Sequence, residues 1–344
     1  MKLGPSFREK IWGSHDLSPV FEPSPKRIGE AWYTFEENTV INGSPPERTL
    51  GQWMTELGPR LMGAFGGGGE KSRPAPYFPI LTKLLFTSRK LSVQVHPDDA
   101  YASAHGQAQD KQGYGKTEMW YVVDARPGAA VALGLTEELS SGDLREAARS
   151  GEIERVLHWV EAGKGQTFFV PAGTIHAIGE GLVIHEIQQN SDITYRLHDF
   201  GRTGGDGKPR TLHIDDAVRV ACQYEHPGAA EPLRLHGSVA GRELLMACPY
   251  FAAERLEWSE RFEYEPDAGR ADILTFLRGR GRIGADNYRP GDCYVIPAAA
   301  EAFEINPDVP SEAIRSYVPD LEKLRSELRD AGAGEERIGG LLHC

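Results

Sequence analysis

The sequence predicts a mainly β protein whose core is a barrel or a sandwich. Short runs rich in Val, Ile, Phe and Tyr recur along the chain, and turn residues separate them: the 344 residues include 39 Gly and 23 Pro. Many short apolar runs between turns are typical of such folds. A chain of this length is also too long for one small core, which predicts two domains.

Most of the strands are expected in the first two thirds of the chain. They are identified by apolar, β-branched or aromatic runs that turn residues bound on both sides. The predicted strands there are 80–86, 90–96, 118–123, 129–133, 166–170, 182–188 and 193–197.

Helical patterns are fewer. Apolar residues at helical spacing and a closing Gly predict a helix in 48–63. The segment 136–160 predicts two or three short helices inserted between strands. Acidic residues near the start of an amphipathic run predict a helix in 213–224, and a last helix is expected in 320–332, which ends at Gly.

A second β-rich unit is expected after a boundary near 225–235. The runs 271–283 and 291–305 both have strand–turn–strand character. The predicted division is a first domain at 1–230 with a helical insertion at about 134–162, a second domain at 231–318, and a C-terminal helix and tail at 319–344.

Composition excludes several classes of partner. The net charge of −12 disfavours nucleic acid and anionic membrane surfaces. No run of 18 apolar residues suggests a membrane span, and the N-terminus lacks the apolar segment of a signal peptide. The four Cys include no CxxC pair, so free thiols and no thiolate zinc site are expected. These features predict a cytoplasmic protein.

Two segments share the pattern of a Gly, five residues and a Pro: GQTFFVPAGTIHAIG and GDCYVIPAAAEAF. The first continues to Gly173 and His176, and the second has Ala299 and Ala302 at those places. This pattern predicts an internal repeat in which only the first copy keeps polar side chains. The turns of the first copy would place His176 at the start of a strand.

The stretch LSVQVHPDD carries polar residues at alternate positions of an apolar strand. Ser92, Gln94 and His96 therefore share one face of it. Glu118 begins the next strand, and His176 begins a later one. Two imidazoles, a carboxylate and an amide oxygen suit Zn²⁺, although Fe²⁺, Mn²⁺ and Ni²⁺ remain open. The alternative is that each histidine is a structural residue of its strand.

Five motifs, in order, resemble one family. IGEAW, LSVQVHPDD, KTEMWYVV, VPAGTIHAIG and EIQQNSDITYRLHDFGR together resemble the type I mannose-6-phosphate isomerases, zinc enzymes of the cupin fold. The resemblance runs from about residue 7 to 225 and continues more weakly to about 318. It implies two cupin-like (jelly-roll) β-barrels, the second without metal, with a small helical insertion and a C-terminal helix.

The resemblance also implies a reaction, the interconversion of D-mannose 6-phosphate and D-fructose 6-phosphate through a cis-enediol with one Zn²⁺ per chain. A metal and a cation would stabilise the negative charge that develops on O1 and O2. The metal charge would lower the pKa of a neighbouring lysine. The implied residues are the zinc ligands Gln94, His96, Glu118 and His176, the substrate-binding Ser92 and Lys83, and the catalytic Arg196 and Lys116.

Several points stay open. The catalytic base is Lys116, a carboxylate or metal-bound water, and either His185 or Glu186 must face the site because they are neighbours on one strand. Another metal-dependent cupin enzyme is an alternative, but Gln94 in place of a histidine favours a redox-inert metal over an oxygenase. A non-catalytic sugar-binding cupin would be expected to lose ligands or Arg196, and none is lost. The sugar phosphate could also differ, because preference between epimers depends on pocket shape.

Overall fold

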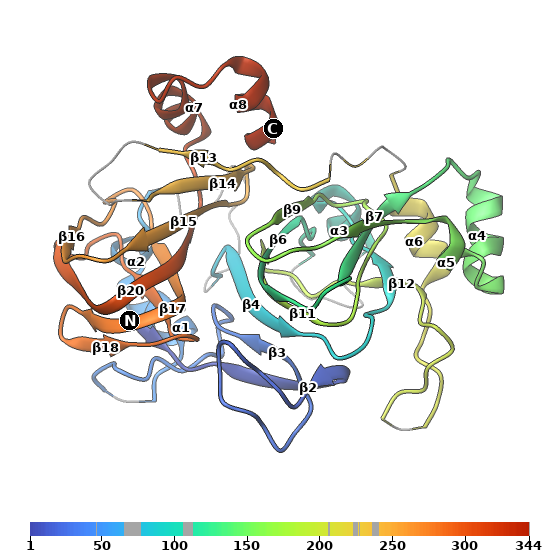
Figure 1. Cartoon of the computed structure of the whole chain (residues 1–344), viewed down its shortest axis with the longest axis horizontal. Coiled ribbons are helices and arrows are strands. Elements are labelled where there is room, and N and C mark those ends of the chain that lie inside the picture. The colour runs from blue at the N-terminus through green and yellow to red at the C-terminus, as the bar shows by residue number, and fades with distance from the viewer. Residues whose placement is uncertain are drawn as a thin grey trace.

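The structure is a computed structural model. It describes residues 1–45, 47–64, 77–105, 113–205, 207–222, 226, 228–235 and 241–343. The protein is mainly β, as predicted, and Figure 1 shows two β regions side by side with short helices around them. We call them the first and second β regions.

The first β region consists of two antiparallel sheets. The six-stranded sheet has the order β2 (Ser6–Ser14), β3 (Ile28–Trp32), β4 (Ile80–Phe86), β11 (Leu182–Gln189), β6 (Glu118–Ala125) and β9 (Thr167–Val170). The five-stranded sheet has the order β12 (Tyr195–His198), β5 (Val93–Val95), β10 (His176–Ile178), β7 (Ala130–Leu135) and β8 (Leu157–Glu161).

The second β region is one antiparallel sheet of nine strands. Its main path is β1 (Lys2–Leu3), β19 (Cys293–Ile296), β17 (Asp272–Ile283), β20 (Phe303–Tyr317), β15 (Ala252–Trp258), β14 (Glu243–Ala247) and β13 (Leu233–Arg234). The remaining two strands are β16 (Phe262–Tyr264), which pairs with β20, and β18 (Asp286–Tyr288), which pairs with β17. The N-terminal strand therefore pairs with strands from the far end of the chain.

The helices are short and peripheral. Those described are α1 (Leu50–Leu57), α2 (Pro59–Met62), α3 (Asp99–His105), α4 (Ser141–Ser150), α5 (Ile153–Val156), α6 (Ile214–Val220), α7 (Leu321–Asp330) and α8 (Glu335–Leu341). In Figure 1, α4 to α6 lie at the outer end of the first β region, and α7 and α8 lie over the second. Among the described residues, no helix is both long and apolar enough to cross a membrane.

The helix predictions are largely confirmed, with three differences. The helix expected in 48–63 divides at Gly58, whose φ of +48° ends α1 before Pro59 starts α2. The helical segment expected at 136–160 is wrong at its end, because Leu157–Glu161 is strand β8 and pairs with β7. The helix expected in 213–224 ends at Val220, because Ala221 is extended, and residues 223–225 fall outside the described part of the chain.

The two β regions share a hydrophobic core. Phe86 and Ile187 of the first region belong to the same buried cluster as Phe251 and Ile314 of the second, and the N-terminal Leu3 joins them. Phe86 and Ile187 lie on the face of the six-stranded sheet that is turned away from the five-stranded sheet. The opposite face of that sheet is therefore free to build a site.

The second β region is filled from within. One part is apolar and aromatic, with Trp258, Phe276 and Tyr288 in contact through their rings. Another part is a buried ion network in which Arg242 and Arg315 hold the carboxylate of a fully buried glutamate, Glu254. Among the described residues, the only group of donors spaced to hold one metal ion lies in the first β region.

Candidate metal centre and active site

Three strands of the five-stranded sheet align polar residues on one face. The Cα of Gln94 in β5 pairs with that of His176 in β10 on one side and with that of Arg196 in β12 on the other. Directly paired residues point to the same face of a sheet. His96 follows two positions after Gln94, so it extends the row. His176 is the first residue of its strand, as predicted.

The six-stranded sheet brings the third group. Glu118, the first residue of β6, places Oε2 at 3.5 Å from His96 Nε2 and Oε1 at 3.5 Å from His176 Nε2. The three donor atoms lie within 4.8 Å of one another. At most 1 % of each residue is exposed. The two sheets thus face each other across a buried group of two imidazoles and one carboxylate.

Both imidazoles are oriented as metal ligands. Nδ1 of His96 lies 2.8 Å from the carbonyl oxygen of Ile193, and Nδ1 of His176 lies 2.9 Å from that of Thr174. A carbonyl only accepts, so each Nδ1 carries the hydrogen and each Nε2 has its lone pair directed to the centre. Burial lowers the pKa of His96 well below its usual value and that of His176 to about 4, so both rings are neutral.

The residues present fit a divalent cation. Nε2 of His176 has no hydrogen-bond partner among the described residues. The centre also attracts positive charge, since Nζ of Lys116 lies 2.9 Å from Glu118 Oε2 and 3.2 Å from His96 Nε2. Neutral imidazole and carboxylate donors are typical zinc ligands. Gln94, half-buried in the same row, adds an amide oxygen.

Lys116 is fully enclosed beside the centre. Burial lowers its pKa, but the charges of Glu118 and Glu186 outweigh this effect, so the net pKa is raised. This direction belongs to the protein without a metal ion. The lowering expected from a metal charge stays a prediction.

The turn before His176 ties the two histidine segments together. The N–H of Gly173 donates to the carbonyl of His96 at 2.8 Å, and the carbonyl of Gly173 accepts from the N–H of Cys222 at 2.8 Å. Gly173 has φ of +87°, and a Cβ there would lie 2.8 Å from Cys222 Sγ and 3.0 Å from the carbonyl oxygen of Val220. Glycine is therefore required on two grounds, backbone conformation and space.

The structure resolves which residue of the 185–186 pair faces the site. Glu186 Oε1 lies 3.4 Å from Nζ of Lys83, which also donates to Gln188 Oε1 at 2.7 Å. His185 points the other way, into the core, and neither of its ring nitrogens has a partner among the described residues. Burial and the charge of Glu118 raise the pKa of Glu186. Sequence reasoning left this carboxylate undecided.

Arginines gather next to this row of residues. Nη1 of Arg196 donates to the carbonyl of Thr211 at 2.8 Å. Burial and then the charge of Arg210 lower the pKa of Arg196 to about 10. Asp199 Oδ1 accepts from Arg202 and, at 3.1 Å, from Arg210. Two guanidinium groups thus share one carboxylate, and Arg196 lies close enough for their charges to affect it, which leaves net positive charge here.

Two of these arginines add to the sequence predictions. Arg202 is partly buried and donates to the carbonyl of Lys90, two residues before the predicted Ser92. Arg210 was not singled out. Its signal was its place in RTGGDGKPR, a Gly-rich stretch that continues directly from the motif EIQQNSDITYRLHDFGR. Ser92 itself is buried.

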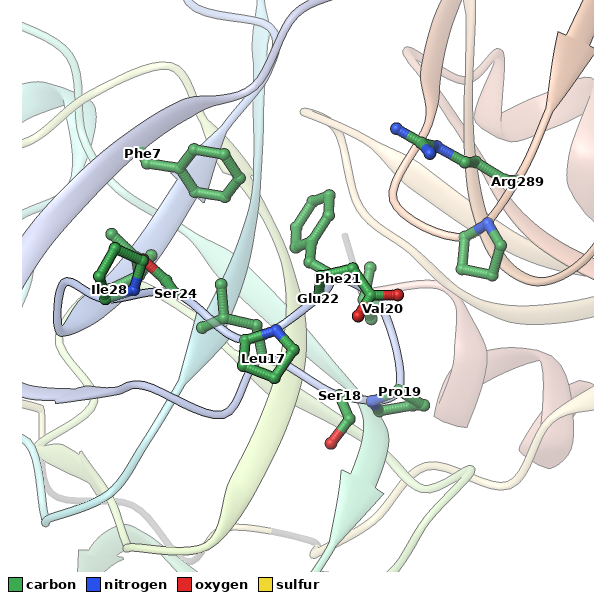
Figure 2. A pocket seen from close by; sticks show the side chains of 13 residues that line it. Phe7, Leu17, Ser18, Pro19, Val20, Phe21, Glu22, Ser24, Ile28 and Arg289 are labelled. Atoms are coloured by element: carbon green, nitrogen blue, oxygen red, sulfur yellow. The ribbon is translucent and has the colours of Figure 1, made fainter.

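A separate pocket of about 660 Å³ lies elsewhere on the molecule (Figure 2). It is lined by the segment between β2 and β3, including Leu17 and Phe21, with Phe7 on one side and Arg289 of the second β region on the other. None of the metal ligands and arginines of the candidate site lines this pocket, so it is distinct from the candidate metal centre.

Comparison with known proteins identifies the family. The family model of the phosphomannose isomerase type I catalytic domain matches residues 1–124. Mannose-6-phosphate isomerase from Streptococcus mutans is 33% identical over 332 residues, which cover 92% of this chain and 97% of the relative. The chain belongs to the type I mannose-6-phosphate isomerase family. A probable mannose-6-phosphate isomerase from Bacillus subtilis, GmuF, is 37% identical over 88% of this chain and 95% of its own.

Solved structures of the family share the fold. The crystal structure of the mannose 6-phosphate isomerase from Bacillus subtilis superposes with a TM-score of 0.78 at 30% identity, covering 92% of this chain and 98% of that one. A zinc-bound mannose 6-phosphate isomerase structure superposes with a TM-score of 0.70 at 15% identity, with the same coverage. At that identity the second likeness establishes the fold alone.

Proposed function

We propose that the protein is a zinc-dependent aldose–ketose isomerase that interconverts D-mannose 6-phosphate and D-fructose 6-phosphate. The observation that carries this proposal is the buried group of His96, Glu118 and His176, with neutral imidazoles whose lone pairs converge, in a member of this family. A structural role alone would not require an unpartnered imidazole nitrogen directed at a carboxylate.

The metal would be held by Gln94, His96, Glu118 and His176. When bound, zinc supplies a Lewis acid that polarises the oxygens of the reacting carbonyl and hydroxyl groups. The set contains no thiolate, and the donors come from two facing sheets, so their geometry is set by the fold rather than by a flexible loop.

The reaction moves a proton between C1 and C2, so a buried group must accept it and return it. Lys116 and Glu186 are buried side chains beside the ligands that can carry a proton, Lys116 next to Glu118 and Glu186 linked to Glu118 through Trp120. We assign the transfer to this pair without ranking its members. Arg196, in the same row as Gln94 and His176, stabilises the negative charge that develops on O1 and O2.

Phosphate recognition needs local cations, because the protein as a whole carries a charge of −12. Lys83 lies on the inner face of the six-stranded sheet, and Ser92 precedes β5 on the five-stranded sheet. We propose that both bind the substrate and that Arg202 and Arg210 provide the positive charge for its phosphate. Guanidinium groups match phosphate oxygens in geometry as well as charge.

We propose that the chain divides into a catalytic unit, a second unit without a metal site, and a C-terminal part. A catalytic unit at 1–230 carries the site, the unit at 231–318 has lost it, and 319–344 adds the C-terminal helices. The pairing of β1 with β19 places the first residues on the second β region. We propose a cytoplasmic enzyme whose partner is its sugar-phosphate substrate.

A coupled assay tests the proposed substrate. The zinc-loaded protein is given D-mannose 6-phosphate, and D-fructose 6-phosphate is followed, with free D-mannose and other aldose 6-phosphates in parallel. We expect turnover of D-mannose 6-phosphate and little of free D-mannose, because the arginine cluster has no phosphate to bind there. A folded, zinc-loaded protein that isomerises only another sugar phosphate would overturn the substrate, and one that isomerises none would overturn the enzyme assignment.

A further inference from the structure

Two tryptophans on the six-stranded sheet each donate a hydrogen bond to the glutamate two positions earlier in the chain. Nε1 of Trp32 donates to Oε2 of Glu30 at 2.8 Å, and Nε1 of Trp120 donates to Oε1 of Glu118 at 3.1 Å. Residues two apart on a strand share a face, so each indole lies beside its carboxylate. The sequences IGEAW and TEMWYV thus contain the same Glu-x-Trp arrangement.

Trp120 has a second carboxylate partner. Its Nε1 also lies 3.3 Å from Oε2 of Glu186, the residue paired with it on the adjacent strand β11. The side chain is completely buried, and its ring meets that of His176 edge-on, with centroids 5.5 Å apart. One N–H therefore bridges Glu118 and Glu186.

This bridge restricts the rotation of Glu118. Its two oxygens must face different histidines, Oε1 towards His176 and Oε2 towards His96. Oε2 is additionally 2.9 Å from Lys116, whereas Trp120 is the hydrogen-bond donor to Oε1. Without the indole N–H, the ammonium group of Lys116 would be the close donor left to Glu118 among the described residues, and the carboxylate could rotate so that Oε1 also turns towards Lys116.

The bridge also lessens a repulsion. Glu118 and Glu186 are both buried, where like charges interact strongly. An indole N–H is a donor with no acceptor capacity, so it serves two carboxylates without adding a charge.

We propose that Trp120 is a positioning residue of the metal centre. Its N–H fixes Glu118 in the orientation that serves both histidines and keeps Glu186 beside it. This inference rests on the proposed zinc site. Hydrogen-bond partners of metal ligands typically affect metal affinity by 10–100-fold when they are removed.

The test compares Trp120→Phe with a matched control, Trp258→Phe. Trp258 is also buried and donates its N–H to a neutral side chain, Tyr288 Oη at 3.3 Å, but in the second β region. Zinc dissociation constants are measured by competition with a chromophoric chelator. We expect zinc to bind about 10–100-fold more weakly to Trp120→Phe, and with unchanged affinity to Trp258→Phe. The rise in melting temperature on adding zinc should shrink in the first variant only.

A third variant separates the donor from the packing. In Trp120→His, the imidazole Nε2 takes the place of the indole Nε1, because each is two bonds from Cγ, while the six-membered ring is lost. We expect Trp120→His to bind zinc more tightly than Trp120→Phe, although it loses more apolar volume.

Several results would overturn the inference. They are wild-type zinc affinity in Trp120→Phe, an equal loss in Trp258→Phe, or no advantage of Trp120→His over Trp120→Phe. A wild-type protein that binds zinc but does not isomerise D-mannose 6-phosphate would overturn the proposed function and leave this inference standing. A wild-type protein that binds no zinc would overturn both.

Discussion

The two glycines of the repeat motif provide a matched test of how the turn before His176 is built. Gly165 has φ of +86° and Gly173 has φ of +87°, so alanine meets the same conformational cost at both, about 1–2 kcal/mol for a left-handed L-residue. Around Gly165 an added Cβ has no neighbour within 4 Å. At Gly173 it meets Cys222 Sγ at 2.8 Å and a backbone oxygen at 3.0 Å, and overpacking of this kind costs a further ~1–3 kcal/mol.

We therefore expect Gly165→Ala to lower the free energy of unfolding by about 1–2 kcal/mol and Gly173→Ala by about 2–5 kcal/mol. Urea denaturation of both variants and the wild type measures the difference. Zinc affinity should also fall in Gly173→Ala, because Gly173 is hydrogen-bonded to the backbone of His96. Equal stability losses in the two variants would refute the claim that crowding at Gly173 fixes this turn.

Three further predictions concern other parts of the molecule. Burial lowers the pKa of His185 to about 3, below its unfolded value of 6.5. Between pH 6.5 and pH 3 the unfolded state therefore binds a proton that the folded state does not, and stability falls as the pH drops through this range. His185→Leu should therefore stabilise the protein by about 2 kcal/mol more at pH 5 than at pH 8 in urea titrations, and a gain that does not depend on pH would contradict this reasoning. Burial alone would raise the pKa of Glu254, but its two arginine partners outweigh this effect and lower the pKa from 4.5 to about 2. The ionised Glu254 therefore stabilises the fold above pH 4.5, and this stabilisation is lost as the pH falls towards 2. Glu254→Gln should lower the free energy of unfolding by about 3 kcal/mol at pH 7, and this loss of stability should become smaller near pH 3. A loss of stability that is the same at both pH values would show that the ion pairs contribute no pH dependence. Arg210→Gln should raise the KM for D-mannose 6-phosphate more than it lowers kcat. The control Arg261→Gln removes an exposed ion pair of the second β region and should change neither value. An unchanged KM in Arg210→Gln would show that this arginine does not bind the phosphate.

Local sequence patterns were sufficient where a strand is buried on both faces. The run 80–86 was predicted with the bounds of β4, because all seven of its residues are buried and turn residues follow it. The start of β10 at His176 was likewise predictable from the Gly and Pro residues before it. By contrast, Leu157–Glu161 continues a helical pattern in sequence but pairs with β7, so a tertiary contact decided its conformation.

The facing of residues within a strand was harder to predict. Strand β11 alternates regularly in its pairing with β4 from Val183 to Gln189, but nearly all of its residues are buried on both faces. Burial on both faces left no polar face to mark the inside, so alternation alone could not tell whether Glu186 or His185 faces the site. Arg210 was missed for a similar reason, because its place depends on a loop folding back onto Asp199.

The second β region shows the same limit. The run 271–283 was expected to turn, but it is one continuous strand, β17. Its pairing with β20 shifts register near Gly279 and Gly281, which admit the opposing strand closely. Glycine therefore indicated an irregularity correctly, and the irregularity was a bulge rather than a turn.

The zinc dependence of the isomerase is tested most directly by measuring zinc content and turnover in the same samples. Wild type and His176→Ala are compared as purified, after chelation and after zinc is restored. We expect one zinc per wild-type chain, turnover that disappears and returns with the metal, and loss of both in His176→Ala. Full turnover by wild type stripped of its metal, or zinc and turnover retained by His176→Ala, would contradict it.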